Sequence, residues 1–258
     1  HDRRSSFCQQ STRMSVELEI NDGVAVITMN RPERKNAFTR EQYELLADAL
    51  KNADTNDEVR VVVLTGAGAA FSSGQDLKEM MELASGVASG APTTSKAGGF
   101  TVLLDALEVF SKPLIAAVNG VAVGIGMTLL PFCDIVLIDE TARMRVPFSE
   151  LGVPPEAASS VLFADRIGWQ RAAELLLTAR WVEATEAVAI GLALRTTPAG
   201  EALSQSRELA TTIASKSAYS TRVIKQLMVA GRGTRTQEAR AREEALFADL
   251  FRSGGFGG

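Results

Sequence analysis

Two glycine-rich stretches offer the clearest chemistry in this sequence. In FSSGQ (71–75), Gly74 turns the chain just before a helix-like segment, and in GVAVGIG (120–126) the glycines stand where a strand gives way to a helix. Glycine lets the backbone approach a ligand closely, and the first N–H groups of a helix have no partner inside it. Two such amides directed at one carbonyl oxygen would form an oxyanion hole, which stabilises an enolate or a tetrahedral adduct.

Other reactive groups are scarce. The one histidine is His1, at the terminus, so we expect no mechanism that needs a catalytic or metal-bound histidine. Cys8 and Cys133 are far apart and have no metal-ligand neighbours, which predicts no metal site, no disulfide scaffold and a reducing, cytoplasmic location. The segment from Gly66 to Gly68 lacks the third glycine of a dinucleotide fingerprint and the lysine of a phosphate loop.

Charge and hydropathy narrow the class of protein further. The net charge is −4 and the basic residues are scattered, so we expect no nucleic-acid partner. The apolar run 113–133 has roughly the length of a membrane span, but it contains Asn119 and Pro131 and lacks flanking charge asymmetry. A buried strand, turn and helix is therefore expected there, and no membrane association.

The elements that must position the glycine turns follow from periodicity. Residues 15–20 and 23–29 read as strands joined by an Asn-Asp-Gly hairpin turn. Thr39 and Gln42 form a capping-box pattern that predicts a helix over 40–53. Further predicted elements are buried strands at 59–66, 114–120 and 134–139, a helix at 100–110, a mobile flap at 85–99, and helices throughout the chain after Pro155.

This alternation of strands and helices predicts an α/β protein with crossover connections. We expect an unstructured or cloning-derived arm at 1–13, with an Arg/Ser-rich transit peptide as the less favoured alternative. A core over 14–198 and a helical C-terminal region over 199–258 follow, because TTPAG (196–200) interrupts the pattern. The tail SGGFGG is of low complexity.

Three blocks in order resemble the signature segments of the crotonase (enoyl-CoA hydratase/isomerase) superfamily: RPERKNAF (31–38), VVVLTGAGAAFSSGQDLKEM (61–80) and KPLIAAVNGVAVGIGMTLLPFCDI (112–135). The likeness covers about residues 16–230. It implies a ClpP-like spiral of repeated ββα units and a C-terminal helical region that forms homotrimers or dimers of trimers. The implied ligand is an enoyl-CoA or other acyl-CoA thioester, with no cofactor beyond the coenzyme A of the substrate.

The resemblance also assigns site residues. The two oxyanion-hole N–H groups fall on Gln75 and Ile125, and the family usually has glycine at the second position. Lys225 matches a common basic CoA-binding position, with a solvated lysine on an amphipathic helix as the alternative. The remaining coenzyme A contacts, largely through the backbone, fall on Arg34, Asn36, Ala37, Phe71, Ser72 and Ser73.

The resemblance separates two reactions. The two glutamates of the hydratase branch align with Thr128 and Phe148, neither of which exchanges protons. LGVPPEAASSVLF (151–163) resembles the active-site block of peroxisomal-type Δ3,Δ2-enoyl-CoA isomerases, whose single catalytic glutamate falls on Glu156. One carboxylate suits that reaction, because it takes a proton from C2 of a 3-enoyl thioester and returns it at C4. Burial among prolines and valine predicts a raised pKa for Glu156.

Alternatives remain open for these residues. Glu156 would be merely structural if it stood in the first turn of a helix, where the dipole favours a carboxylate. Glu150 is expected to be structural, and Asp76 to cap the helix that it opens. At the level of function, the alternatives are a hydratase-like, non-catalytic acyl-CoA binder and another enolate-stabilising acyl-CoA enzyme, such as a thioesterase or dehalogenase.

Overall fold

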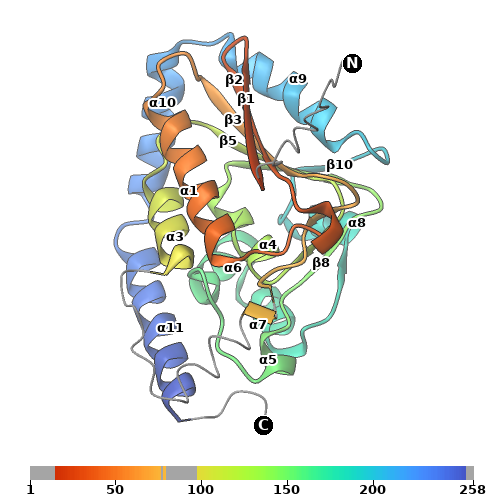
Figure 1. Cartoon of the computed structure of the whole chain (residues 1–258), viewed down its shortest axis with the longest axis vertical. Helices are drawn as coiled ribbons and strands as arrows, with labels where there is room; N and C mark the ends of the chain where they lie inside the picture. The colour runs from red at the N-terminus through yellow and green to blue at the C-terminus, as the bar shows by residue number, and fades with distance from the viewer. Residues whose placement is uncertain (1–14, 77, 80–97, 254–258) are drawn as a thin grey trace, which may run out of the picture.

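The computed structural model describes residues 15–76, 78–79 and 98–253. The predicted arm at 1–13, residues 85–97 of the predicted flap and the tail from 254 lie outside these residues. Within them, two β-sheets stand beside a column of helices that includes α1 (Arg40–Thr55), α3 (Gly99–Val109) and α11 (Arg235–Arg252) (Figure 1). None of the described helices combines the length and the apolar character that a membrane span needs.

The larger sheet begins with the predicted hairpin. β1 (Val16–Asn21) pairs antiparallel with β2 (Val24–Met29), and the turn residues Asp22 and Gly23 have φ angles of 49° and 80°, as a tight two-residue turn requires. Four strands then continue the sheet in parallel, in the order β3 (Val61–Gly66), β5 (Leu114–Val118), β7 (Ile135–Asp139) and β10 (Arg195–Thr197). The runs without polar alternation in β3 and β5 are buried on both faces, as the sequence predicts.

A repeat of two strands and a helix builds both sheets. β3, β5 and β7 are followed by β4 (Ala70–Ser72), β6 (Val121–Val123) and β8 (Arg143–Arg145), which lie side by side and parallel in a smaller sheet completed by β9 (Val182–Glu183). The repeats then end in α3, α4 (Ile125–Thr128) and α5 (Phe148–Leu151). The expected spiral of ββα units is therefore confirmed.

Helices cover both faces of the larger sheet. On one face, α1 begins after Thr39, whose hydroxyl accepts the Gln42 N–H at 3.3 Å, and packs side by side with α3. On the other face, Ala202 and Ala210 of α9 (Ala202–Ala214) pack on the valines of β2 and β3. The helix that follows the predicted boundary near 199 is therefore an integral cover of the sheet.

Helices after Gly124 and after Pro155 were also predicted, whereas the short helices at 32–34, 130–132 and 148–151 were not. The stretch after Gly124 gives only the single turn of α4, because Pro131 starts a separate 3-10 helix, η2 (Leu130–Phe132). The remaining helices are η1 (Pro32–Arg34), α6 (Ser159–Ile167), α7 (Trp169–Thr178), α8 (Ala184–Ile190) and α10 (Ala218–Ala230).

Candidate active site

The two glycine turns meet beyond the carboxyl ends of β4 and β6. These strands are parallel neighbours, so the segments that leave them run out together. Gly74 and Gly124 have φ angles of 93° and 53°, which disfavour residues with a side chain. A Cβ on Gly74 would lie 2.8 Å from the Val123 carbonyl oxygen, and one on Gly126 would lie 2.7 Å from the Ser72 carbonyl oxygen. Glycine is therefore required for the two backbones to come this close.

The amides that follow these glycines are the two that the resemblance singles out. Phe38 and Gln75 form an isolated parallel β-bridge, in which the Phe38 N–H donates to the Gly74 carbonyl and the Asp76 N–H donates to the Phe38 carbonyl. The Gln75 N–H itself takes no part in the bridge. The Ile125 N–H belongs to the first residue of α4, which has no intrahelical acceptor. Among the residues that the structure describes, neither N–H has an acceptor. Ile125 is only 1% exposed, and its side chain packs in the hydrophobic core.

Glu156 lies beside these turns. A Cβ built on Gly124 would be 3.9 Å from the Glu156 Oε1 atom and 3.9 Å from the Gly74 Cα atom, so the carboxylate and both glycines occupy one neighbourhood. Glu156 is partly buried and precedes the first residue of α6 by three positions. The alternative of a carboxylate in the first helical turn is therefore wrong.

The surroundings of Glu156 favour its neutral form. Its pKa is raised from 4.5 to about 8, first because burial disfavours the charged carboxylate and second because the negative charge of Glu243 lies nearby. A carboxyl group in this range can both accept and return a proton near neutral pH. The raised pKa that the sequence predicted is thus present, but the sequence did not indicate the contribution of Glu243.

Tyr43 also faces the site, although nothing in the sequence indicated a role for it there. Its hydroxyl donates to Gln75 Oε1 at 2.7 Å, while its ring stacks on Phe38 at a centroid distance of 4.6 Å. Burial, and then the charges of Glu156 and Glu79, raise the pKa of Tyr43, so it remains a neutral hydroxyl. Because Tyr43 belongs to the apolar stripe of α1, its spacing indicated only core packing.

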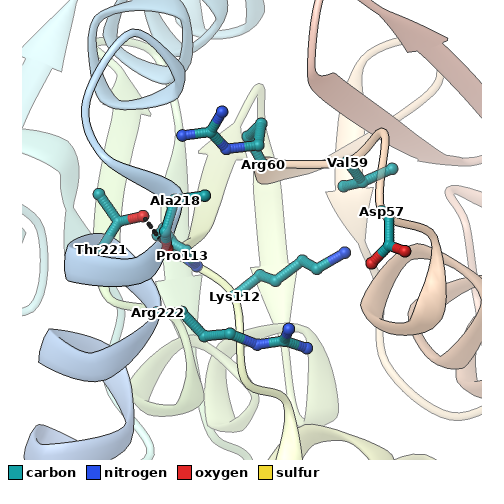
Figure 2. Close-up of a pocket in the computed structure, with 8 residues that line it drawn as sticks. All are labelled: Asp57, Val59, Arg60, Lys112, Pro113, Ala218, Thr221 and Arg222. Carbon is teal, nitrogen blue, oxygen red and sulfur yellow. Dashed lines mark hydrogen bonds between the residues drawn. The ribbon is translucent and has the colours of Figure 1, made fainter.

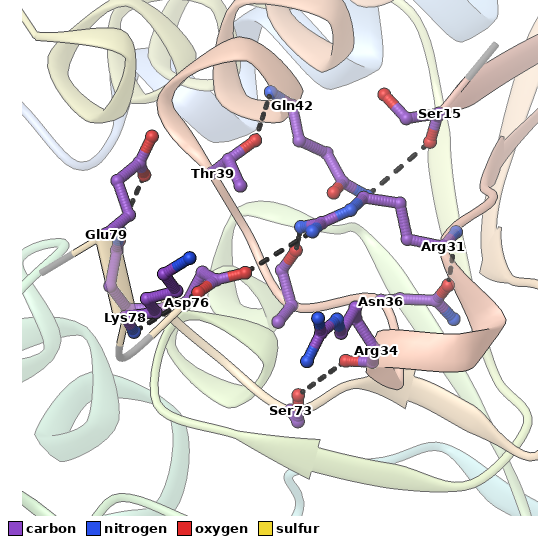
Figure 3. A network of polar contacts seen from close by, with 12 residues as sticks. Ser15, Arg31, Arg34, Asn36, Thr39, Gln42, Ser73, Asp76, Lys78 and Glu79 are labelled. Carbon is purple, nitrogen blue, oxygen red and sulfur yellow. Dashed lines mark hydrogen bonds and ion pairs between the residues drawn. The ribbon is translucent and has the colours of Figure 1, made fainter.

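A polar frame fixes the first glycine turn to the segment 31–38 (Figure 3). The Arg31 guanidinium donates to the Ala37 carbonyl at 2.6 Å and to Asp76 Oδ2 at 3.3 Å. Asp76 Oδ1 accepts the Lys78 N–H at 3.2 Å, as expected of a helix cap. Asn36, fully buried, donates to the carbonyls of Ala67 and Ala70 at 2.9 and 2.7 Å.

The candidate coenzyme A residues lie along this frame. The two candidate segments run together, because the Ser73 N–H donates to the Lys35 carbonyl at 2.9 Å and the Ser72 hydroxyl to the Asn36 carbonyl at 2.9 Å. Phe71 and Ala37 are buried, while Arg34 is exposed beside them. Their role as coenzyme A contacts stays a prediction.

Lys225 lies in different surroundings from those expected of a solvated lysine. Its side chain is 3% exposed, and its ammonium group is 2.8 Å from Asp134 Oδ1. The alternative of a solvated lysine on an amphipathic helix is therefore wrong. The arrangement ties α10 to the segment before β7, whereas the coenzyme A contact implied by the resemblance remains a prediction.

The structure places no titratable side chain at the two hydratase positions. Thr128 is fully buried on α4, and Phe148 is 5% exposed at the start of α5. Glu150 forms an ion pair with Arg145 at 2.5 Å and is half exposed, as expected of a structural residue. The arrangement thus offers one proton-transfer carboxylate beside two donors for an oxyanion.

Two cavities are lined by residues other than those of the glycine turns. One, of about 390 Å³, borders Pro155 and is lined mainly by apolar side chains of α5, α6 and α7. The other, of about 90 Å³, lies where β3 and β5 begin, at their opposite ends from the glycine turns (Figure 2). There, Lys112 donates to the Ala53 and Asn56 carbonyls at 2.8 and 2.6 Å and so caps α1. This second cavity therefore lies where the segments before β3 and β5 meet α10.

Comparisons with known proteins agree with this geometry. A family model described as enoyl-CoA hydratase/isomerase matches residues 19–256. Enoyl-CoA delta isomerase 2 of Rattus norvegicus is 43% identical over 179 residues, which cover 68% of this chain and 44% of that protein. Short-chain-enoyl-CoA hydratase of Clostridium acetobutylicum is 31% identical over 242 residues, which cover 92% of this chain and 89% of that protein.

A solved structure gives the same picture. The crystal structure of an enoyl-CoA hydratase/isomerase from Pseudoalteromonas atlantica matches with a TM-score of 0.85 and 34% identity, and the match covers 92% of this chain and 91% of that chain. The chain spans only about half the length of the isomerases that it matches, with 44% and 55% of two of them covered.

Proposed function

Because this chain belongs to the enoyl-CoA hydratase/isomerase family, within the crotonase superfamily, we propose that it moves the double bond of a 3-enoyl-CoA to the 2-enoyl position. The observation that carries the proposal is a single carboxylate, Glu156, beside two unpartnered backbone amides at the glycine turns. Relatives named for isomerisation and for hydration both match the chain, so the choice between these reactions rests on the residues of the site.

The proposed reaction requires only these groups. Glu156 removes a proton from C2 of the substrate, and the electrons pass to the thioester oxygen. The N–H groups of Gln75 and Ile125 stabilise that negative charge as a dienolate. Glu156 then returns the same proton at C4, so nothing is consumed and no cofactor is needed beyond the coenzyme A carried by the substrate.

Hydration is disfavoured by what stands at the other two positions. Addition of water needs one group to activate the water and another to protonate the α-carbon. Thr128 and Phe148 can do neither at neutral pH, because neither side chain exchanges a proton there. We therefore favour isomerisation over hydration, with the non-catalytic acyl-CoA binder as the rival reading.

We further propose how the ligand and the subunits are arranged. Coenzyme A would lie along the paired segments 34–37 and 71–73, where the exposed Arg34 can reach a phosphate. Assembly into homotrimers would use the C-terminal helices, because α10 exposes the large apolar side chains Tyr219, Ile224, Leu227 and Met228. The free and buried Cys133 thiol fits the cytoplasmic location that we propose.

The decisive assay compares two substrates. The purified protein is incubated with trans-3-hexenoyl-CoA and with crotonyl-CoA, and the conjugated enoyl absorbance is followed. We expect isomerisation of the first without hydration of the second, and Glu156→Gln should lower kcat by about 10²- to 10⁴-fold, the usual contribution of a general base. Glu150→Gln, which removes a half-exposed carboxylate six residues earlier, is the matched control and should retain activity.

Two outcomes would contradict the proposal. Hydration of crotonyl-CoA at a rate comparable with isomerisation would mean that a second proton donor exists. Tight binding of acyl-CoA without turnover of either substrate would establish the non-catalytic binder.

A further inference from the structure

The loop that presents Glu156 is held by a helix from the other end of the chain. Glu243, on α11, accepts the Ala158 N–H through Oε2 at 2.7 Å, and its Oε1 accepts the Ser160 N–H at 3.1 Å and the Ser160 hydroxyl at 2.5 Å. Its side chain is only 4% exposed. Both oxygens of the Glu243 carboxylate are therefore used to bind the loop at Ala158 and Ser160.

The loop needs such support because its backbone is unusual. Ala157 and Ala158 follow Glu156 directly and have φ angles of 57° and 56°. Two successive residues with a Cβ in the left-handed region are strained. Ala158 is also the N-cap of α6 and has no side chain to accept the first N–H groups of that helix. Glu243 supplies the missing acceptor from a distant element.

The position of Glu243 is itself fixed by ion pairs. On the same face of α11, Arg240 binds Asp105 and Glu108 of α3, at 3.0 Å each, and its side chain is 8% exposed. Ala239, the residue before Arg240, is fully buried in the hydrophobic core. The spacing of Arg240 and Glu243 places both on one side of the helix. Arg240 holds α11 against α3, and Glu243 reaches the loop 156–160.

We propose that Glu243 is a positioning residue for the active-site base: from α11 it holds the strained turn 157–160 and so keeps the Glu156 carboxylate beside the two glycine turns. This inference rests on the proposed function, which makes Glu156 the base. It assigns the C-terminal region a part in the chemistry of its own chain, in addition to the assembly role that the family resemblance implies.

The charge of Glu243 adds a signature that a purely structural residue would lack. The titratable and charged groups around the pair are Glu156 and Glu243 themselves, Arg242 beside Glu243 on α11, and the neutral Tyr43 on α1, whose pKa Glu79 also raises. Burial raises the pKa of Glu243, while its hydrogen bonds and Arg242 lower it. Removing the Glu243 charge relieves repulsion on Glu156, so the pKa of Glu156 must fall.

The test uses Glu243→Gln with Asp249→Asn as its control. Asp249 lies on the same helix, where its carboxylate is 65% exposed and pairs with the exposed Arg252. For Glu243→Gln we expect kcat to fall by about 10- to 100-fold with KM within about threefold of wild type, because the base is misplaced while binding is intact. The acid limb of the pH profile of kcat/KM should move to lower pH. The control should show neither change.

A second measurement separates this inference from the proposed function. The ionisation of Glu156 is followed without substrate, by ¹³C NMR of glutamate-labelled protein, with the signal assigned by its loss in Glu156→Gln. A lower pKa in Glu243→Gln supports the coupling even if no isomerisation is found. An unchanged titration together with an unchanged kcat in folded Glu243→Gln would overturn the inference.

Ser160→Ala keeps the inference testable if Glu243→Gln does not fold. It removes one of the three hydrogen bonds and leaves the charge in place. We expect kcat to fall about fivefold, which corresponds to the loss of one ordinary hydrogen bond. A wild-type kcat in folded Ser160→Ala would show that the hydrogen bonds between Glu243 and the turn 157–160 do not position Glu156.

Discussion

The raised pKa of Glu156 makes a prediction about stability that needs no substrate. Below pH 4.5 the carboxyl is protonated in both the folded and the unfolded chain, so its environment costs nothing. Between pH 4.5 and about 8 the unfolded chain releases the proton and the folded chain keeps it. The unfolded state then binds fewer protons, so the free energy of unfolding falls as pH rises through this window. Glu156→Gln, which is always neutral, lacks this loss.

The magnitude follows from the pKa values. A rise from 4.5 to about 8, at 1.36 kcal/mol for each pH unit, gives roughly 5 kcal/mol as the upper figure. Because Glu156 is only partly buried, solvent screening reduces the expected difference to roughly 2–5 kcal/mol. Glu156→Gln should therefore be more stable than wild type by this amount at pH 8.5, with little of the difference left at pH 4.5.

Urea unfolding at several pH values measures this difference directly. Both proteins are compared at the same concentration, because assembly would otherwise change the apparent stability. Glu150→Gln serves as the control, since its exposed ion pair with Arg145 is worth at most about 1 kcal/mol and should give no such trend. A stability difference between Glu156→Gln and wild type that stays constant from pH 4.5 to 8.5 would refute the reasoning.

Four further substitutions, one of them a control, test residues in the frame and at Lys225. Gly74→Ala would place a Cβ 2.8 Å from a facing carbonyl oxygen, so kcat should fall at least about tenfold, whereas Gly152→Ala, also at positive φ but with open space around it, should cost about 1 kcal/mol of stability and retain activity. Asn36→Ala should lower the free energy of unfolding by roughly 2–4 kcal/mol in urea, because it removes three hydrogen bonds of a fully buried amide, two to the Ala67 and Ala70 carbonyls and one from the Arg31 N–H. Lys225→Met should cost roughly 3 kcal/mol and leave the KM for acyl-CoA unchanged, since the lysine is occupied by an ion pair; a higher KM at unchanged stability would instead establish the coenzyme A contact.

Much of the architecture was readable because local patterns and the fold agree. The hairpin at Asp22-Gly23 needs positive φ angles that these residue types tolerate, and α1 begins at its Thr39 cap. The unbroken apolar runs of β3 and β5 indicated strands covered on both faces. In each case the residue types within one short segment are enough to predict the turn, the helix start or the strand.

Only the tertiary structure decided which distant residues act together. The sequence identified Glu156 and the glycine turns, but their proximity depends on β4 and β6 being neighbours in the smaller sheet. Glu243 lies in a run of charged residues that reads as a solvated helix face, and it becomes buried only because α11 packs against α3 and α6. Local backbone and side-chain preferences are written into short segments, whereas the environment of a carboxylate is set by elements far away in the chain, whose packing no short segment contains.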